Sequence, residues 1–569
     1  DGYGLGTPIM AIFPNLDTSS MATRFDIAPS VEKDAKIVLL EVQSDGSAER
    51  IPYFAELDAQ ADDPKDQVLF VRPAVILEED TRYIVAFRNL KTTSGDPIEP
   101  SEAFERLRDE NVESGTVLAK RKDRFEDVFK ILDDQGVSRD SLTLAWDFRT
   151  ASSDGIHGRM LKMRKDAFGK VGTKGPELDF KMENVEEFAD QPNGNKEFDL
   201  HIGLQIEGTY EVPHYMKRVG DSRKWIFNLN EQGEVVQNGT REAKFLMRVP
   251  HTALEGEEVG VVLYGHGLLG SREEIKARVW SKMAKEHNYI FIATDWTGMA
   301  HFDRQTAIAA TTEISNFQGM ADRLHQGILD FLVLGRAAKH RLANLKPLTS
   351  RNVKVDTDDV HYAGGSQGGI FGQTYMALSE EITRGFLAVP GNNYSTMLQR
   401  SVNFDIFLKS MKISYPSPAD RAICIAAMQQ LWSGTDPVSY ASHIEEEPLI
   451  SGAPDKDVLL TVSKGDYQVA VVTNEVLARS DVGIPLLENY DDMHTPWNTP
   501  TVSYPHEESG IILFDYGNPW PDRQNRPPKD DGDDPHNNLG QVKRAGELVE
   551  EFFRNEKIIS ICGMGPCDF

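Results

Sequence analysis

HYAGGSQGG, residues 361–369, contains the pattern Gly-x-Ser-x-Gly with Ser366 at its centre. An apolar segment ending at Tyr362 precedes the pattern, and the segment 370–378, whose composition suits a helix, follows it. This order of strand, turn and helix is the context in which a nucleophilic serine is held on a sharp turn. The glycines give the turn conformational freedom, and the first amides of the following helix favour developing negative charge. Because small residues collect at many strand-to-helix turns, a catalytic interpretation needs an oxyanion hole, an acid and a base elsewhere in the chain.

The composition describes a large acidic protein. The chain has 569 residues and a formal net charge of −28, from 61 Lys and Arg against 89 Asp and Glu. This balance argues against binding to polyanions, namely nucleic acid and anionic membrane surfaces. No apolar run approaches the roughly 18 residues that a transmembrane segment needs. The length predicts two or three domains at roughly 150 residues per domain.

The first residue and the cysteines bear on the compartment. The chain begins at Asp1 without a methionine, so we expect that a targeting segment, whose type the sequence does not show, has been removed. We expect the protein to be secreted or to lie in the cell envelope. Cys562 and Cys567 have the spacing of a small disulfide loop, which fits an oxidising compartment. Half of a metal site is the alternative, although no second Cys/His pair lies at ligand spacing. Cys424 lies in an apolar run and is expected to be an inert core thiol.

Residues 1–153 are expected to form a mainly β accessory domain. Segments in which apolar and polar residues alternate are separated by Asp, Gly and Pro turns, which is typical of a β-sandwich. These segments are 36–42, 67–72, 82–87 and 142–148, and a helical insert at 101–137 interrupts them. The charged residues 154–199, with one helix at 158–168, are expected to be a connector.

The same region resembles the immunoglobulin-like (Ig-like) N-terminal domain of bacterial extracellular lipases of the virulence-factor type. The residues that carry the resemblance are Asp1-Gly2-Tyr3-Gly4, Pro8-Ile9, Val71-Arg72-Pro73, Leu77, Thr81-Arg82-Tyr83 and the segment 144–152. The resemblance implies an Ig-like sandwich that precedes a catalytic domain.

Residues 200–569 are expected to form that catalytic domain, of the α/β class. Two long β-like stretches, 201–212 and 243–249, suit antiparallel strands that lead into a sheet. After them, short apolar strands alternate with longer helical segments, as in an open, mostly parallel sheet. The expected strands are 259–264, 289–294, 360–363, 386–389, 458–462 and 511–514, and apolar residues at helical spacing predict helices over 317–331 and 539–552.

An oxyanion hole is the first feature that must accompany Ser366. GHGLLGS, residues 265–271, directly follows the strand expected at 259–264. One donor of such a hole is the amide after the nucleophile, that of Gln367, and the other comes from this loop, for which we expect Leu268. Paired glycines let the backbone approach a tetrahedral oxygen to within about 3 Å. His266 is then a structural residue of the loop and not the base, whereas a Gly-rich turn of no consequence is the alternative.

An acid and a base are the second and third features. Asp466 follows the strand expected at 458–462, at the carboxyl edge of the sheet. There it would fix the tautomer of a histidine. The alternative is that Asp466 is only the N-cap of a helix. Of the histidines after Asp466, His494 and His506 precede the last strand, and only His536 follows it. His536 is therefore the expected base. The acidic loop at 529–534 would raise the pKa of His536 if it lies close, and it could hold Ca²⁺, although such loops are more often solvated.

The order Ser366, Asp466, His536 is the order of α/β-hydrolases, and residues 200–569 resemble the catalytic domain of serine esterases and lipases of that fold. The resemblance implies that Ser366 is the nucleophile, Asp466 the acid and His536 the base, with the amides of Leu268 and Gln367 as the oxyanion hole. The loop at 265–271 is similar to that of true lipases rather than to the HGGG loop of esterases. Gly365 departs from the pattern, since many lipases have His at this position.

Residues 391–456 are too many for a simple crossover between two strands. We expect them to form a cap or lid over the site, with an apolar inner face suited to acyl chains or aromatic esters. A helical excursion that packs on itself is the alternative. Trp296 and Met299, in the loop after the strand at 289–294, are expected to line the substrate pocket.

These observations predict an Ig-like β-sandwich followed by an α/β-hydrolase domain that cleaves carboxylic esters through an acyl-enzyme, without a cofactor or a metal. The expected substrate is a small-molecule, lipid or polymeric ester, whose acyl and alcohol groups the sequence does not specify. A serine peptidase or amidase on the same scaffold is one alternative. A non-catalytic binding protein of the cell surface is another. The sequence makes no prediction about the oligomeric state.

Overall fold

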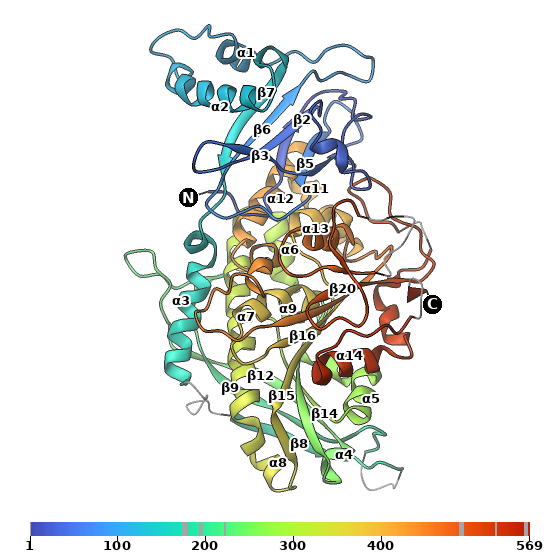
Figure 1. Ribbon diagram of the computed structural model, residues 1–569. Helices are drawn as coiled ribbons and strands as arrows, with labels where there is room; N and C mark the ends of the chain where they lie inside the picture. The colour runs from blue at the N-terminus through green and yellow to red at the C-terminus, as the bar shows by residue number, and fades with distance from the viewer. Residues whose placement is uncertain are drawn as a thin grey trace.

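The computed structural model describes residues 2–172, 180–192, 197–220, 224–488, 494, 496–529 and 532–562, together with the backbone of residues 567 and 568. Figure 1 shows two parts stacked along one axis, with small N-terminal sheets at one end and a large sheet flanked by helices below them. The nucleophile turn expected at Ser366 lies in the large part, at the end of one of its central strands.

The N-terminal residues form two antiparallel sheets that share one core. The first has the strand order β1-β5-β4 and the second the order β3-β2-β6-β7. Leu69 and Val71 of the first sheet and Val85 and Phe87 of the second meet in this core. The strands are β1 (Ile9–Ile12), β2 (Ile37–Val42), β3 (Ala48–Arg50), β4 (Tyr53–Leu57), β5 (Val68–Pro73), β6 (Arg82–Arg88) and β7 (Leu142–Arg149). The four alternating segments of the sequence are therefore strands β2, β5, β6 and β7, while the Ig-like character of this sandwich stays a prediction.

The expected helical insert covers the outer face of the second sheet. It contains α1 (Glu102–Arg108) and α2 (Lys122–Asp134), whose apolar side chains pack on the residues of β2 and β6 that point away from the shared core. Ser101 is the N-cap that precedes α1, because its hydroxyl accepts a hydrogen bond from the amide of Phe104. The insert lies at the end of the molecule farthest from the large sheet (Figure 1).

One large mixed sheet organises the rest of the chain. Its strand order is β19-β18-β20-β17-β16-β15-β13-β14-β12-β9-β8, with β21 paired to β20. Strands β13 to β17 and β20 run parallel, whereas β12, β9 and β8 form an antiparallel flank. The six expected parallel strands and the two lead-in strands, β9 and β12, are all present. The strands are β8 (Phe180–Glu187), β9 (Ile202–Pro213), β12 (Thr240–Pro250), β13 (Glu258–Gly265), β14 (Tyr289–Thr294), β15 (Lys354–Gly365), β16 (Arg384–Ala388), β17 (Asp457–Ser463), β18 (Leu486–Leu487), β19 (Thr501–Val502), β20 (Gly510–Asp515) and β21 (Cys567–Asp568); a separate hairpin pairs β10 (Met216–Arg218) with β11 (Trp225–Phe227).

Helices cover both faces of this sheet, because parallel strands bury side chains on both sides. Along β13, Val261 and Leu263 join one core, while Val262 and Tyr264 join the other. The first core includes α3 (Ser153–Val171), α7 (Phe317–His340) and α9 (Gln367–Leu378), and the second includes α5 (Arg278–Glu286) and α14 (Ala545–Asn555). The large part of the molecule is thus an α/β structure of three layers.

The connector expected at 154–199 departs from its prediction. It contains the long helix α3, as expected, but also β8, which forms the outermost strand on one side of the large sheet. β8 reads FKMENVEE and has no buried residue. An edge strand pairs on one side only and can remain solvated, so it lacks the apolar alternation by which sequence reasoning finds strands.

The insertion between β16 and β17 is helical, as its length suggests. It contains α10 (Tyr394–Met397), α11 (Asp405–Ser414) and α12 (Pro418–Trp432), with short 3₁₀ turns between and after them. Phe407, Leu408 and Met411 of α11 and Met428 and Trp432 of α12 are buried in the first core. The remaining helices are α4 (His251–Leu254), α6 (Arg304–Thr312), α8 (Lys346–Thr349) and α13 (Val472–Arg479).

A buried polar network joins the N-terminal sheets to the insertion. Glu56 of β4 forms ion pairs with Arg72 of β5 and with Arg400, which follows α10. Arg72 also donates a hydrogen bond of 3.1 Å to the hydroxyl of Thr396. All three charged side chains are no more than 4% exposed. The network therefore anchors the sandwich to the part of the chain that covers the large sheet.

Two further sequence expectations concern membranes and cysteines. Among the described residues, no helix combines the length and the apolarity that crossing a membrane requires. Cys424 of α12 is a buried free thiol, as expected. The expected disulfide between Cys562 and Cys567 involves a side chain outside the described residues, so it stays a prediction.

Candidate active site

Ser366 occupies the turn between β15 and α9, in a backbone conformation that residues other than glycine rarely adopt. Its φ is 55° and its ψ is −120°. The flanking glycines are required by close backbone contacts: a Cβ at Gly364 would lie 2.4 Å from the carbonyl oxygen of Gly368, and one at Gly368 would lie 1.9 Å from that of Gly265. Such strained residues persist only where the surroundings force them, and they cluster at functional sites. The geometry is that of a nucleophile elbow.

Gly365 does not belong to this tight packing. A Cβ at this position would meet only the hydroxyl of Tyr264, at an ordinary contact distance of 3.6 Å. Gly365 also lines the cavity in front of Ser366. The position where many lipases have His is therefore open here, and its glycine leaves space beside the serine.

His536 and Asp466 form a buried pair at the carboxyl edge of the sheet. Nδ1 of His536 and Oδ2 of Asp466 are 2.7 Å apart, and both side chains are no more than 3% exposed. The other carboxylate oxygen, Oδ1, accepts hydrogen bonds from the amides of Gln468 and Val469 at 2.7 and 3.0 Å. These bonds fix the carboxylate, and the carboxylate in turn fixes the imidazole with its proton on Nδ1.

The surroundings of His536 raise its pKa. Burial alone would lower this pKa, but the charge of Asp466, the hydrogen bond from Nδ1 and the charge of Asp534 together raise it above its usual value. Asp534 also accepts the amide of His536 at 3.1 Å and caps the 3₁₀ helix that carries this histidine (Pro535–Gln541). The imidazolium that forms during general-base catalysis would be stabilised by the same charges.

Ser366 and His536 open onto one cavity of about 1450 Å³. Nε2 of His536 is buried and has no hydrogen-bond partner among the residues that the structure describes. Since Nδ1 is held by Asp466, Nε2 is the nitrogen that remains to exchange a proton with a group in the cavity. Hydrogen bonds of catalytic residues are often loose before substrate binds and tighten only in the complex.

The loop after β13 lines this cavity and has one backbone amide without a hydrogen-bond partner among the described residues. Gly267 donates its N–H to Oε2 of Glu274 at 2.9 Å, and Leu269 donates its N–H to the carbonyl of Met299 at 2.9 Å. The amide of Leu268, between them, has no hydrogen-bond partner among the described residues. Leu268 lines the cavity beside Ser366, and Gln367 is the first residue of α9. The residues of the two expected oxyanion donors, one on a loop and one at a helix N-terminus, both line the space at Ser366, and their role stays a prediction.

His266 holds this loop and is not available as a base. Its Nε2 accepts the amide of Trp296 at 2.8 Å, and its Nδ1 is 2.8 Å from the carbonyl oxygen of Gly267. Burial lowers its pKa to about 4. A neutral imidazole with both nitrogens engaged ties the β13 loop to the β14 loop, as the sequence interpretation expects.

A second, apolar cavity of about 80 Å³ begins at the same serine. Both Ser366 and Gln367 contribute to its wall. Its apolar lining comes from the insertion, from α6, α7 and α9, and from loops: Leu268, Leu269, Met299, Ala307, Phe317, Met320, Ile370, Tyr394, Met397, Leu398, Phe404, Phe407, Met428, Trp432 and Val469. Part of the predicted cap therefore forms the wall of this cavity, whereas its ability to move stays a prediction.

Of the two residues expected to line the pocket, only Met299 does so. Trp296 is completely buried and lines neither cavity. Its ring stacks on that of Phe331 of α7, with centroids 3.4 Å apart, so it packs the β14 loop against the helix layer. The sequence placed it in the correct loop but could not show that a helix further along the chain would cover it.

The other candidate histidines lie elsewhere. Nε2 of His494 is 3.0 Å from the buried carboxylate of Glu475, and neither His494 nor His506 lines the two cavities. Of the acidic loop proposed for Ca²⁺, Asp530 and Asp531 lie outside the described residues. Asp534 is engaged with His536, Tyr467 and Gln468. Calcium binding at this loop stays a hypothesis.

Glu274 is a residue of the site that sequence reasoning missed. Besides accepting the amide of Gly267, it fills the space next to Gly270, where a Cβ would lie 1.9 Å from its Oε1. Burial raises its pKa. The only signal in the sequence was a carboxylate seven residues after Gly267 of the Gly-rich turn. That spacing is not specific enough to identify a residue that supports the loop.

Comparison with known proteins does not assign the chain to a family. No family model and no curated protein matches it. Acetyl xylan esterase 1 from Thermoanaerobacterium sp. is 13% identical with a TM-score of 0.38, over 71% of this chain and 94% of that one. An esterase from Pyrococcus furiosus is 13% identical with a TM-score of 0.29 (55% and 87% covered), and an acylaminoacyl peptidase from Pyrococcus horikoshii is 15% identical with a TM-score of 0.30 (62% and 48% covered). Similarities this weak carry no function over to the chain.

Proposed function

We propose that this chain is a serine hydrolase of the α/β-hydrolase fold that cleaves carboxylic esters through an acyl-enzyme. One observation carries the proposal: Ser366, on a left-handed elbow, and His536, held by Asp466, open onto the same cavity. In this proposal Ser366 is the nucleophile, His536 the general base and Asp466 the acid. The amides of Leu268 and Gln367 form the oxyanion hole.

Each group has a defined task in this mechanism. Nε2 of His536 takes the proton of Ser366 while the serine oxygen attacks the ester carbonyl, and the two amides stabilise the resulting oxyanion. His536 then gives the proton to the leaving alcohol, and a water molecule, activated by the same nitrogen, hydrolyses the acyl-enzyme. Asp466 remains ionised and stabilises the imidazolium. No step needs a cofactor.

The two cavities support an ester with an apolar acyl group. The narrow apolar cavity ends at Ser366 and would hold the acyl chain, since burial of an alkyl chain there removes apolar surface from water. The larger cavity reaches Ile308 of α6 and Ile406 of α11, which are 36% and 58% exposed, and would take the alcohol part. A small-molecule or lipid ester fits this division. Secretion or a cell-envelope location remains part of the proposal.

Replacement of the nucleophile tests the proposal. Ser366→Ala should abolish hydrolysis of p-nitrophenyl butyrate and labelling by a fluorophosphonate probe, while its Tm stays near that of the parent chain. Ser350→Ala, at an exposed serine, is the matched control and should keep both properties. Turnover by Ser366→Ala beyond a small residue would remove this serine from the mechanism.

The competing functions give different results in the same assays. A peptidase or amidase would turn over a matched p-nitroanilide or peptide amide as well as the more reactive p-nitrophenyl ester, whereas an esterase would cleave the ester and leave the anilide almost intact. A binding protein without catalysis would show neither turnover nor labelling by the probe.

A further inference from the structure

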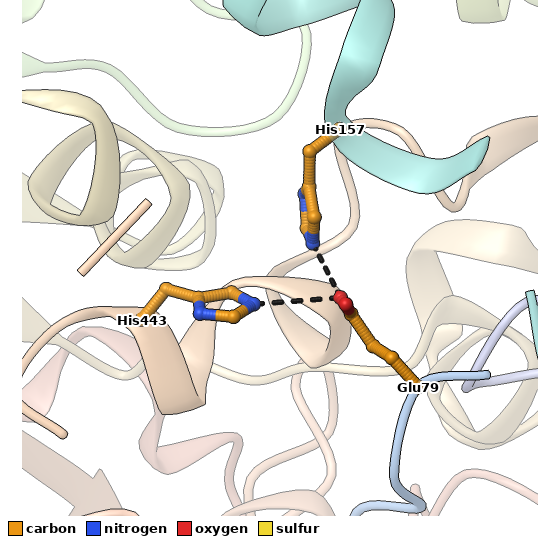
Figure 2. A group of neighbouring side chains, drawn as sticks. All are labelled: Glu79, His157 and His443. Atoms are coloured by element: carbon orange, nitrogen blue, oxygen red, sulfur yellow. Dashed lines mark hydrogen bonds and ion pairs between the residues drawn. The ribbon is translucent and has the colours of Figure 1, made fainter. Parts of the chain in front are cut away.

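Three side chains from distant parts of the chain converge outside the catalytic cavities. Glu79 lies in the loop between β5 and β6, His157 on α3, and His443 in a 3₁₀ turn at Ala441–His443 of the insertion. Figure 2 shows both rings directed at the carboxylate of Glu79. The distances from Oε1 of Glu79 are 2.7 Å to Nε2 of His157 and 3.4 Å to Nε2 of His443, and the three atoms lie within 4.8 Å of one another.

The tautomer of His443 suits a metal ligand. Its Nδ1 is 2.6 Å from the carbonyl oxygen of Glu447, and because a carbonyl only accepts, Nδ1 must carry a proton. In its neutral form, His443 therefore has the lone pair of Nε2 on the side of Glu79, where a cation can bind both groups; in its protonated form, it donates a hydrogen bond to Glu79 instead. Metal-binding histidines have this arrangement, with the second ring nitrogen donating to a carbonyl or a carboxylate.

The electrostatic surroundings also favour a cation. Besides Glu79, the carboxylates of Glu78 and Glu447 lie close enough to His443 for their charges to interact with it. Three carboxylates therefore surround the two imidazoles. An ionised carboxylate and a neutral imidazole are the forms that bind metals.

We propose that Glu79, His157 and His443 bind a divalent transition-metal ion of the Zn²⁺ type. Two histidines and one glutamate, completed by water, form an established ligand set for this ion. Bonds of about 2.0–2.2 Å in a tetrahedral site place ligand atoms roughly 3.3–3.5 Å apart, so modest side-chain rotations convert the observed cluster into such a site. The side chain of Glu79 is 20% exposed, which leaves a path for the ion and a place for the water.

The proposed site would link three separate segments of the molecule. None of its residues lines the cavities at Ser366. Glu79 belongs to the N-terminal sandwich, His157 to the helix that follows it and His443 to the insertion that walls the apolar cavity. An ion here would therefore clamp the sandwich to the insertion, and it would bind only the folded chain, which raises thermal stability.

Zn²⁺ binding to the full chain tests this proposal. The chain is treated with EDTA, dialysed and titrated with ZnCl₂ by calorimetry, and bound Co²⁺ is followed by its visible absorption. The parent should bind one Zn²⁺ per chain at micromolar or lower Kd, with a Tm that is higher in Zn²⁺ than in EDTA. His443→Gln and Glu79→Gln should weaken this binding at least tenfold and remove the Tm difference. His340→Gln is the matched control, since it removes another histidine that contacts a carboxylate, Glu381, and it should bind as the parent does.

The parent chain alone can overturn the proposal, whatever the stability of the variants. Absence of stoichiometric Zn²⁺ binding to the parent, or an equal Tm in Zn²⁺ and EDTA, would show that the cluster is only a hydrogen-bonded clamp. Equally tight binding to folded His443→Gln would place the ion elsewhere and would also overturn it.

Discussion

The proposed role of Ser366 as the nucleophile depends on the residues next to it. Its left-handed backbone is possible because Gly364 and Gly368 leave room for two backbone segments to approach closely. A methyl group at Gly368 would lie 1.9 Å from the carbonyl oxygen of Gly265, and neither backbone segment can give way easily. The strain is thus held by the packing of β13 against the start of α9, which also brings the Leu268 loop next to the serine.

In the proposed mechanism, the pKa of His536 sets the lower end of the pH range of activity. The base must be neutral, so kcat/KM should fall as the pH drops through the pKa of His536, which lies above the usual value of about 6.5. Asp534→Asn keeps an oxygen that can accept the amide bonds but removes one negative charge near the ring. We therefore expect the acidic limb of the kcat/KM profile to move to lower pH in this variant.

Asp533→Asn is the control for this measurement, because the Asp533 side chain is exposed and is not among the causes of the shift. A limb that stays in place in Asp534→Asn, or a parental limb below pH 6, would contradict this account of the base.

The insertion and α6 together form most of the wall of the apolar cavity, so these two elements are expected to select the acyl chain. Among p-nitrophenyl esters, kcat/KM should rise from acetate towards octanoate until the cavity is filled. Each buried methylene contributes about 0.8 kcal/mol, or roughly fourfold. A rate that is flat or falls from acetate onwards would contradict the assignment of this cavity to the acyl chain.

A substitution on α6 tests the same assignment. Ala307 lines the apolar cavity, so Ala307→Leu should lower the rate on octanoate more than the rate on acetate. Ala309→Leu, two residues away on the exposed side of the helix, should leave the ratio of the two rates unchanged. Equal effects of both substitutions on the ratio would mean that α6 does not contact the acyl group.

The sequence predicted the residues whose positions follow from the order of strands along the chain. It did not predict features that depend on packing between distant parts of the chain. The positions of Ser366, Asp466 and His536 followed from which strand each residue follows, and the structure places the last two in direct contact. β8 could not be predicted, because an edge strand needs no apolar alternation. The burial of Trp296 depends on α7, and the cluster around Glu79 joins residues 78 and 364 positions apart, which no local pattern records.

At the scale of the whole molecule, the N-terminal sandwich is an integral part of the structure. Glu56 lies between Arg72 and Arg400 with almost no exposure. Burial would raise the pKa of Glu56, but the charges of Arg400 and Arg72 hold it below its usual value. Because the folded-state pKa is lowered, the stability that this carboxylate contributes is present above its unfolded pKa and is lost as the pH falls.

Glu56→Gln should therefore destabilise the chain strongly, by about 3–5 kcal/mol, because it leaves two buried guanidinium groups without their shared carboxylate. The measurement is the free energy of unfolding at neutral pH, or the Tm. Glu49→Gln, at an exposed glutamate of β3, is the control and should stay within about 0.5 kcal/mol of the parent. Equal stability of the two variants would mean that the network does not hold the sandwich in place.

The central claim is that His536, and no other histidine, serves Ser366. The direct measurement is the kcat of His536→Ala and His494→Ala on the same ester, with the fold of both variants checked by Tm. His494 is the informative control, because it also contacts a buried carboxylate, that of Glu475. We expect His536→Ala to lose on the order of 10⁴- to 10⁶-fold in kcat, close to the loss in Ser366→Ala, and His494→Ala to stay within about tenfold of the parent. An active His536→Ala, or a folded but inactive His494→Ala, would contradict the assignment of the site.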